Sequence, residues 1–374
     1  MKLSKPIILL LLLLIHSCIT PFVPEIERDK ELMVVEGLIT DQPRTNTIKL
    51  SKSLALWKSS SPTPLKGCTV WISDNLDNVD SLKEISRGTY VTDSLQFKGE
   101  IGRQYTLHII TAAAYGNLSY ESDPIEMKPV PPLDVCYEKE LFIQNHQTIE
   151  GCQFYLDTYD PTNSCKFYRW EYSETWEFHL PYDVPNRVCW ISNNSDEILI
   201  KNTSVLNESR INRFPFYFIS NPIDRLEVKY SILVNQYSLN EGEYLYWERL
   251  QNMKEQSGGL YDIMPATIPS NIHCLDNPLE KVLGYFSVSA MSSKRVFVKD
   301  FFSNPPANGM YNNCPFDTIY GDTIIGGNLG SFLWVIIEYP DTVPRIRILT
   351  NKRDCADCRV RGTDIEPDFW NDDQ

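Results

Sequence analysis

Cys355 and Cys358 form the one C-x-x-C motif of this 374-residue chain. Two thiols at this spacing can act as a redox pair, supply half of a zinc site, or enter structural disulfides. A redox pair would be expected in a βαβ context, which the sequence lacks. A zinc site would need two further ligands, and His273 with Cys274 is the one pair with suitable chemistry. We therefore predict structural disulfides at Cys355 and Cys358, with each other or with other cysteines, and neither a metal nor a cofactor.

A different chemistry is indicated for Cys18. Lys2 and Lys5 precede nine consecutive Ile and Leu residues, 7–15. This run is too short to cross a bilayer but has the length of a signal-peptide core. The residues that follow, ending in Ser17 and Cys18, resemble a bacterial lipobox, in which the cysteine is acylated. We expect a signal peptide over 1–17, lipid attachment at Cys18 and an acidic, proline-containing tether over 18–31; an ordinary secretory signal with an incidental cysteine is the alternative.

Charge and motifs argue against several classes of function. The net charge of −14 excludes a typical nucleic-acid binder, because phosphate backbones are held by clustered Lys and Arg. The sequence contains no H-E-x-x-H, G-x-S-x-G, P-loop or G-x-G-x-x-G motif. We therefore predict no catalytic residues, although 49 acidic residues leave a hydrolase built on a carboxylate pair as a further hypothesis.

An Asp-Ser/Thr-aliphatic pattern occurs five times, which is more than composition predicts. It resembles the O-glycosylation acceptor of Bacteroidota envelope proteins, and the alternative is turn formation, because Asp followed by Ser or Thr often begins a turn. The candidate acceptors are Ser81, Ser94, Thr318, Thr323 and Thr342.

The elements that would position these residues are mostly strands. Residues 32–128 contain about seven short strand-like segments, which predict an immunoglobulin- or transthyretin-like β-sandwich. Within it, a G-x-x-Y-x-L segment around Tyr105 predicts a tyrosine whose hydroxyl satisfies backbone at a corner. Three prolines in 129–132 end this unit and form a stiff linker.

Residues 133–374 predict a second, larger β-rich domain that ends in an irregular tail containing the C-x-x-C motif. Alternation over 167–180 places Trp170 and Trp176 on one face, which is either the inner face of a sandwich or a platform for stacking sugars. A helix is predicted near 241–255, with Asn240 as its cap. Residues 282–290 and 294–300 are predicted to form a hairpin.

Several segments considered together resemble one family. They are Cys18 and the segments 32–41, 88–90, 230–239, 244–247, 271–274, 284–287, 355–358 and 367–370. As a set they are similar to a Bacteroidota envelope lipoprotein family known as domain-of-unknown-function family 4249. The resemblance implies an outer-membrane-associated lipoprotein, often encoded beside TonB-dependent receptors, and it implies no catalytic residue.

We therefore expect a mainly β, two-domain protein that is held at the outer membrane by its N-terminal lipid and acts by binding. Its expected partner is a TonB-dependent β-barrel uptake channel. The alternatives are a glycan-binding or adhesin-type surface protein that uses exposed aromatics, and a glycan or peptide hydrolase.

Overall fold

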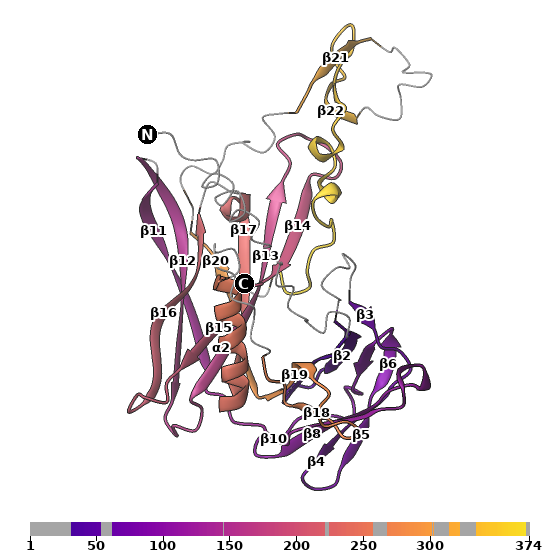
Figure 1. Cartoon of the computed structure of the whole chain (residues 1–374). Coiled ribbons are helices and arrows are strands. Elements are labelled where there is room, and N and C mark those ends of the chain that lie inside the picture. Colours follow the sequence, from indigo (N-terminus) through magenta and orange to yellow (C-terminus); the bar gives the residue numbers. More distant parts are fainter. Residues whose placement is uncertain are drawn as a thin grey trace, which may run out of the picture.

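The computed structural model describes residues 31–53, 62–144, 146–220, 224–256, 268–300, 302, 314–321 and 334–371. Within them the chain is mainly β-strand, as predicted, and forms two sandwiches and a projecting arm (Figure 1). The predicted signal peptide, Cys18 and the tether up to residue 30 lie outside the described residues. In the described part of the chain, no helix is both long and apolar enough to span a membrane.

The first sandwich consists of two six-stranded sheets that enclose one apolar core. One sheet has the order β19-β1-β2-β7-β6, with β3 on β2, and the other has the order β18-β9-β8-β4-β5, with β10 on β8. The strands of the first sheet are β1 (Met33–Thr40), β2 (Thr47–Lys52), β3 (Thr63–Pro64), β6 (Lys83–Ser86), β7 (Thr89–Val91) and β19 (Val282–Ser289). Those of the second are β4 (Thr69–Asp74), β5 (Val79–Ser81), β8 (Gln104–Ile110), β9 (Ser119–Ser122), β10 (Ile125–Glu126) and β18 (Ile272–Cys274).

Alternation along these strands creates the core. Val35 of β1 and Leu107 of β8 are buried, while their sequence neighbours are more exposed. The predicted tyrosine corner is present, because the hydroxyl of Tyr105 accepts a hydrogen bond from the backbone N–H of Glu100 at 2.7 Å.

The first sandwich is not complete at residue 128. Its strands β18 and β19 come from 272–289, so the chain returns to it after building most of the second sandwich. The hairpin predicted for 282–300 was wrong, since β19 pairs in parallel with β1 and the next strand, β20 (Met291–Val298), pairs with β17 of the second sandwich. The reason is burial: Phe286 and Val288 fill the first core, and the chain changes sandwich at the buried residue Ala290.

The second sandwich packs a three-stranded sheet on a five-stranded sheet. The first has the order β11-β12-β16, and the second has the order β14-β13-β17-β20, with β15 also on β13. The strands are β11 (Leu133–Gln144), β12 (Gln147–Asp160), β13 (Phe167–His179), β14 (Val188–Asn194), β15 (Leu199–Asn202), β16 (Ser209–Ser220) and β17 (Lys229–Leu239), together with β20.

The helix α2 (Glu241–Gln256) begins where the sequence predicted it. The side-chain oxygen of Asn240 accepts a hydrogen bond from the backbone N–H of Glu243 at 2.8 Å, as an N-cap does. The helix packs against β13 and β15 of the second sandwich and against β19 of the first, so it covers the seam between them (Figure 1).

The arm extends beyond the second sandwich (Figure 1). Its outer part is a three-stranded sheet of the order β21-β23-β22, and two short 3-10 helices follow it. These elements are β21 (Asp317–Tyr320), β22 (Trp334–Tyr339), β23 (Ile346–Thr350), η3 (Arg353–Cys355) and η4 (Cys358–Val360). Two further 3-10 turns, η1 (Ala113–Tyr115) and η2 (Asp224–Leu226), lie in the sandwiches.

Candidate functional site

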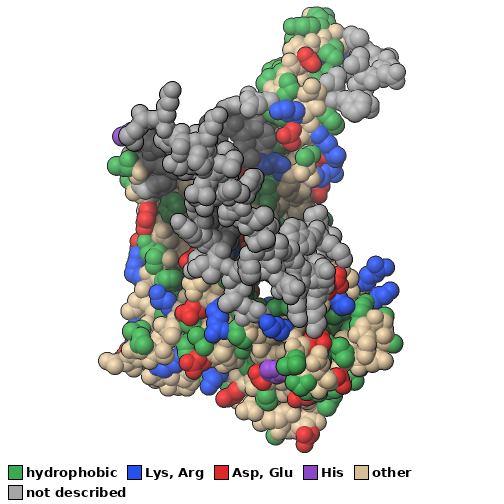
Figure 2. All heavy atoms as spheres, in the orientation of Figure 1, with side chains coloured by type: hydrophobic (Ala, Val, Ile, Leu, Met, Phe, Trp, Pro, Cys, Tyr) green, Lys and Arg blue, Asp and Glu red, His purple; other side chains and the backbone are tan. Residues whose placement is uncertain are grey.

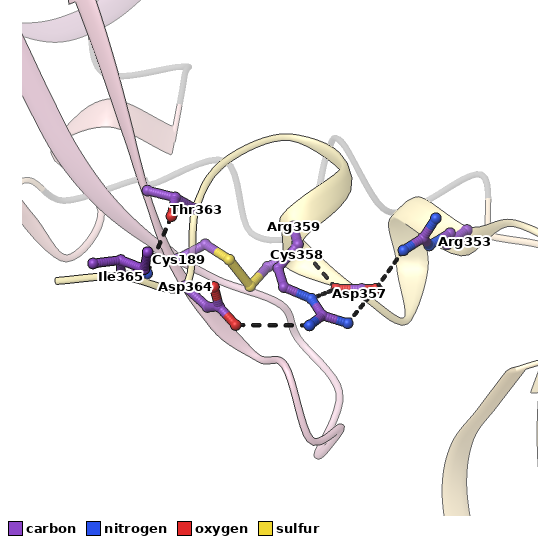
Figure 3. The surroundings of a disulfide bond; sticks show 8 residues. All are labelled: Cys189, Arg353, Asp357, Cys358, Arg359, Thr363, Asp364 and Ile365. Carbon is purple, nitrogen blue, oxygen red and sulfur yellow. Dashed lines mark hydrogen bonds and ion pairs between the residues drawn. A yellow bond between two sulfur atoms is a disulfide. The ribbon is translucent and has the colours of Figure 1, made fainter.

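The two cysteines of the C-x-x-C motif enter different disulfides. Cys355 bonds Cys314, 41 residues earlier, and so joins the two ends of the arm. Cys358 bonds Cys189, 169 residues earlier, and fastens the base of the arm to β14 (Figure 3). The motif therefore takes part in two neighbouring disulfides. One closes the arm, and the other attaches the arm to the second sandwich. The described cysteines outside these disulfides, Cys68, Cys136, Cys152, Cys165 and Cys274, carry free thiols.

Asp357, between the two disulfide cysteines, is held by two arginines. The Nε atom of Arg359 lies 2.9 Å from one carboxylate oxygen, and Nη2 atoms of Arg359 and Arg353 each lie 3.1 Å from the other (Figure 3). Hydrogen bonds from Arg359 in particular lower the pKa of Asp357 far below its usual range. Asp357 is therefore ionised at any physiological pH. Arg359 also lies 3.8 Å from Asp364.

A pocket of about 460 Å³ opens beside this cluster. Its wall combines Arg353, Arg359 and Asp357 with the half-buried ring of Trp334 from β22, and Asn186 comes from the segment before β14. Figure 2 shows Lys and Arg side chains where the arm meets the body. Each guanidinium carries five N–H donors, of which Asp357 uses a minority. The pocket can therefore bind an anionic group while an apolar ring rests on the indole.

Trp170 and Trp176 do not form a surface platform. They are 0% and 5% exposed and face the core between the two sheets of the second sandwich. The indole N–H of Trp170 donates to Gln236 at 2.9 Å inside the core. The hypothesis of a sugar-binding face at these two residues is therefore wrong. The large apolar side chains that alternate over 167–180 face the core of the second sandwich.

Glu174, the polar exception on that inner face, is also buried. Its carboxylate accepts hydrogen bonds from the hydroxyl of Tyr230 at 2.8 Å and of Tyr217 at 3.1 Å, and Arg225 forms an ion pair with it at 3.1 Å. These partners lie on β16, β17 and η2, which are separate from Glu174 in the sequence. The full set of partners indicates a structural role for Glu174.

The comparison with known families decides the classification. The family model described as "Domain of unknown function (DUF4249)" matches residues 19–295. The chain belongs to the DUF4249 family. No curated protein matches its sequence.

The DUF4249 match covers the first sandwich and most of the second, including Cys189. It ends before Cys314, Cys355, Cys358 and the sheet of the arm. The pocket is therefore lined by Asn186 from the matched region and by residues beyond residue 295, which the family model does not cover.

The candidate acceptors of O-linked sugars are spread over the molecule. Ser81, Ser94 and Thr318 are exposed, Thr342 is half-buried, and Thr323 lies outside the described residues. Asp93 accepts a hydrogen bond from the backbone N–H of Leu95 at 2.9 Å, which is the turn geometry that the alternative explanation predicts.

Strand pairing brings together three side chains that no sequence motif predicted: Ser73, His108 and Glu121. The hydroxyl oxygen of Ser73 lies 2.8 Å from Nε2 of His108, and Nδ1 of His108 lies 3.4 Å from the carboxylate of Glu121. The order resembles a nucleophile, base and acid, but Ser73 lies on a central strand with neighbours on both sides. Backbone N–H groups in such a ladder are engaged and cannot stabilise an oxyanion, so we assign no catalysis here. Among the described residues, no group of three or more His, Cys, Asp and Glu side chains could hold a metal ion.

Proposed function

We propose that this DUF4249 protein is a lipid-anchored outer-membrane protein that acts by binding, as an accessory to a TonB-dependent uptake channel. The observation that carries the proposal is the pocket at the base of the arm. It places an indole and two guanidinium groups at the root of an element that extends away from the body (Figure 1). The lipobox-like sequence at Cys18 and the family resemblance supply the membrane part of the proposal.

The chemistry of the pocket favours binding over conversion. A general acid or base needs a pKa near the working pH, so that it can both take up and release a proton. Asp357 has a pKa far below that range, and arginine stays protonated. These groups can attract and orient an anionic ligand, but they cannot exchange protons with it.

Recovery of a partner tests the channel proposal. The tagged full-length protein, extracted from its native membrane in detergent, should co-purify with a large β-barrel protein. A different tagged lipoprotein from the same membrane serves as the control bait. If the barrel is absent, or if the control bait recovers it equally well, the accessory role is wrong.

The pocket is tested separately with the double variant Arg353→Ala/Arg359→Ala. Both side chains are partly exposed, at 57% and 44%, and the disulfides of Cys355 and Cys358 on either side of Asp357 should keep the backbone in place without them. We expect the variant to retain the barrel but to lose anionic small molecules that co-purify with the wild type, as measured by mass spectrometry of extracts. Equal ligand content in both proteins would place the binding site elsewhere.

A further inference from the structure

The outer face of the second sheet in the first sandwich carries one continuous row of side chains. Strand register aligns Ser81 of β5 with Trp71 of β4, Trp71 with His108 of β8, His108 with Glu121 of β9, and Glu121 with His273 of β18. Directly opposed residues lie on the same face of a sheet with their Cβ atoms about 5 Å apart. The row therefore crosses the sheet from an edge strand to the opposite edge.

Within the row, the rings of Trp71 and His108 are stacked. Their centroids are 4.9 Å apart and their planes differ by 8°. Because the two residues are opposed across β4 and β8, parallel rings at this distance must stand upright on the sheet. His108 is itself held on both sides, by Ser73 at 2.8 Å and by Glu121 at 3.4 Å. The indole is thus fixed in orientation, with one of its two faces covered by the imidazole.

The second face of the indole points toward β5. The residue opposite Trp71 on that strand is Ser81, which is exposed and too short to cover an indole. The next outward residue on β5, Val79, is 63% exposed. Trp71 remains half-buried and is absent from the apolar core of the first sandwich. The strip above β5 is therefore an open surface with an upright aromatic wall along one side.

We infer that this face of Trp71 binds one pyranose ring of a neutral glycan. The C–H face of a sugar ring packs on an indole, and hydroxyl groups beside the indole can hydrogen-bond to the sugar hydroxyls. The hydroxyls of Ser81 and of Thr69, another exposed residue of β4, lie on the same side of the sheet as the indole. Glu121 lies beyond His108, away from the strip, so no carboxylate of the row faces the ligand. This inference does not depend on the channel proposal or on the pocket of the arm.

Trp71 differs from Trp170 and Trp176 in the exposure of its indole. Those indoles are sealed between two sheets, whereas Trp71 lies on an outer face and its free side opposes a serine. His108 acts here as a positioning residue, because it touches the indole and not the sugar.

The test is titration of the full-length, disulfide-bonded protein with neutral hexasaccharides of glucose, mannose, galactose and xylose. Binding is followed by calorimetry and by tryptophan fluorescence. At least one of the four should bind, and Trp71→Ala should weaken that binding by at least about tenfold. His108→Ala should weaken glycan binding by a smaller factor than Trp71→Ala does. It should also broaden the tryptophan emission band of the complex, because the indole is no longer held upright. Tyr320→Ala, which removes a ring that is 62% exposed on the arm, should bind like the wild type.

A second variant keeps the test valid if Trp71→Ala fails to fold. Ser81→Phe adds a ring on an exposed edge strand and leaves Trp71 in place, so the first sandwich should form while the free indole face becomes covered. We expect this variant to lose glycan binding and to keep the thermal unfolding profile of the wild type. The inference is wrong if none of the four hexasaccharides binds the wild-type protein, or if Ser81→Phe binds them unchanged.

Discussion

Glu174 and Glu243 are two of the buried carboxylates in or beside the second sandwich, and their surroundings differ. Glu174 has two tyrosine hydroxyls and one guanidinium as partners. Glu243, at the start of α2, is fully buried, and one of its carboxylate oxygens has no hydrogen-bond partner. Burial therefore raises the pKa of Glu243 to about 7, although Arg169, Ser287 and Trp247 oppose this shift. Glu243 lies in the first turn of the helix that was predicted near 241–255, but its burial depends on the return of β19 to the seam between the sandwiches.

The raised pKa of Glu243 makes the stability of the folded protein depend on pH. Glu243 takes up its proton more readily when folded than when unfolded, where its pKa is near 4.5. Its contribution to stability is therefore complete below pH 4.5 and is lost as the pH rises to about 7. Glu243→Gln, which cannot ionise, should gain up to about 3 kcal/mol relative to the wild type between pH 4 and pH 8. Urea unfolding of both proteins at several pH values measures this difference.

The control for that experiment is Glu241→Gln, which removes an exposed acid from the same helical turn. Its stability relative to the wild type should stay nearly constant over the same range of pH. A constant difference for Glu243→Gln as well would show that folding does not raise the pKa of Glu243.

At the scale of elements, the sequence predicted the type of most segments but not all of their partners. Alternation over 167–180 predicted β13, and Asn240 predicted the start of α2. The pattern of β19 is equally apolar, yet it could not indicate which of two sheets the strand would join. Period-2 alternation defines which side of a strand is buried and carries no information about the neighbouring strand. Long-range pairing decided that case, and it also brought β18 and β19 into the sandwich that was predicted to end at residue 128.

The returning strands lead to a prediction about folding. A fragment containing residues 31–131 lacks β18 and β19, so β1 loses its parallel partner and the core loses Phe286, which is 0% exposed. Removal of a buried Phe alone typically costs about 3–5 kcal/mol, a large share of the stability of a small domain. We expect this fragment to show no cooperative thermal unfolding by circular dichroism. A fragment in which a flexible linker adds residues 268–290 should unfold cooperatively; an equally stable fragment without them would contradict the prediction.

The two disulfides should have separable effects. The Cys189–Cys358 bond spans 169 residues and ties the arm to β14, so the pair Cys189→Ala/Cys358→Ala should lower the stability of the second sandwich by about 2–5 kcal/mol. The pair Cys314→Ala/Cys355→Ala removes the bond that closes the arm, which spans 41 residues. It should speed proteolysis within the arm and lower the stability of the second sandwich less than the first pair does, although both cysteines are buried at the edge of its core. Limited proteolysis and thermal unfolding of both pairs distinguish these outcomes; identical behaviour would contradict the assignment of different roles.

For the whole molecule, the sequence identified Cys355 and Cys358 but could not predict the pocket they support. Their partners are 41 and 169 residues away, and the spacing of a C-x-x-C motif contains no information about such distant cysteines. The indole of Trp334 and Asn186 also reach the pocket through separate elements. The charge is informative at this scale, because a chain with a net charge of −14 places two arginines in the wall of the pocket. Local attraction of an anionic ligand must therefore overcome long-range repulsion by the body, and such a balance depends on ionic strength.

Attachment to the membrane concerns the chain as a whole. In our proposal the retention of the protein at the membrane depends on acylation of Cys18, the cysteine of the lipobox-like sequence. Cells that express Cys18→Ser should release the protein from the membrane fraction, and labelled palmitate should no longer be incorporated into it. Co-purification of the β-barrel should fall as well, because a soluble chain loses the high local concentration that a shared membrane provides.

The matched control is Cys136→Ser, which replaces a half-buried free thiol far from the N-terminus. This variant should remain in the membrane fraction and incorporate palmitate like the wild type. Membrane retention and labelling of Cys18→Ser at wild-type levels would mean that another part of the chain makes the attachment. A third outcome is that Cys18→Ser leaves the membrane fraction and still recovers the barrel at wild-type levels. The contact with the channel would then depend on protein surfaces and not on the lipid.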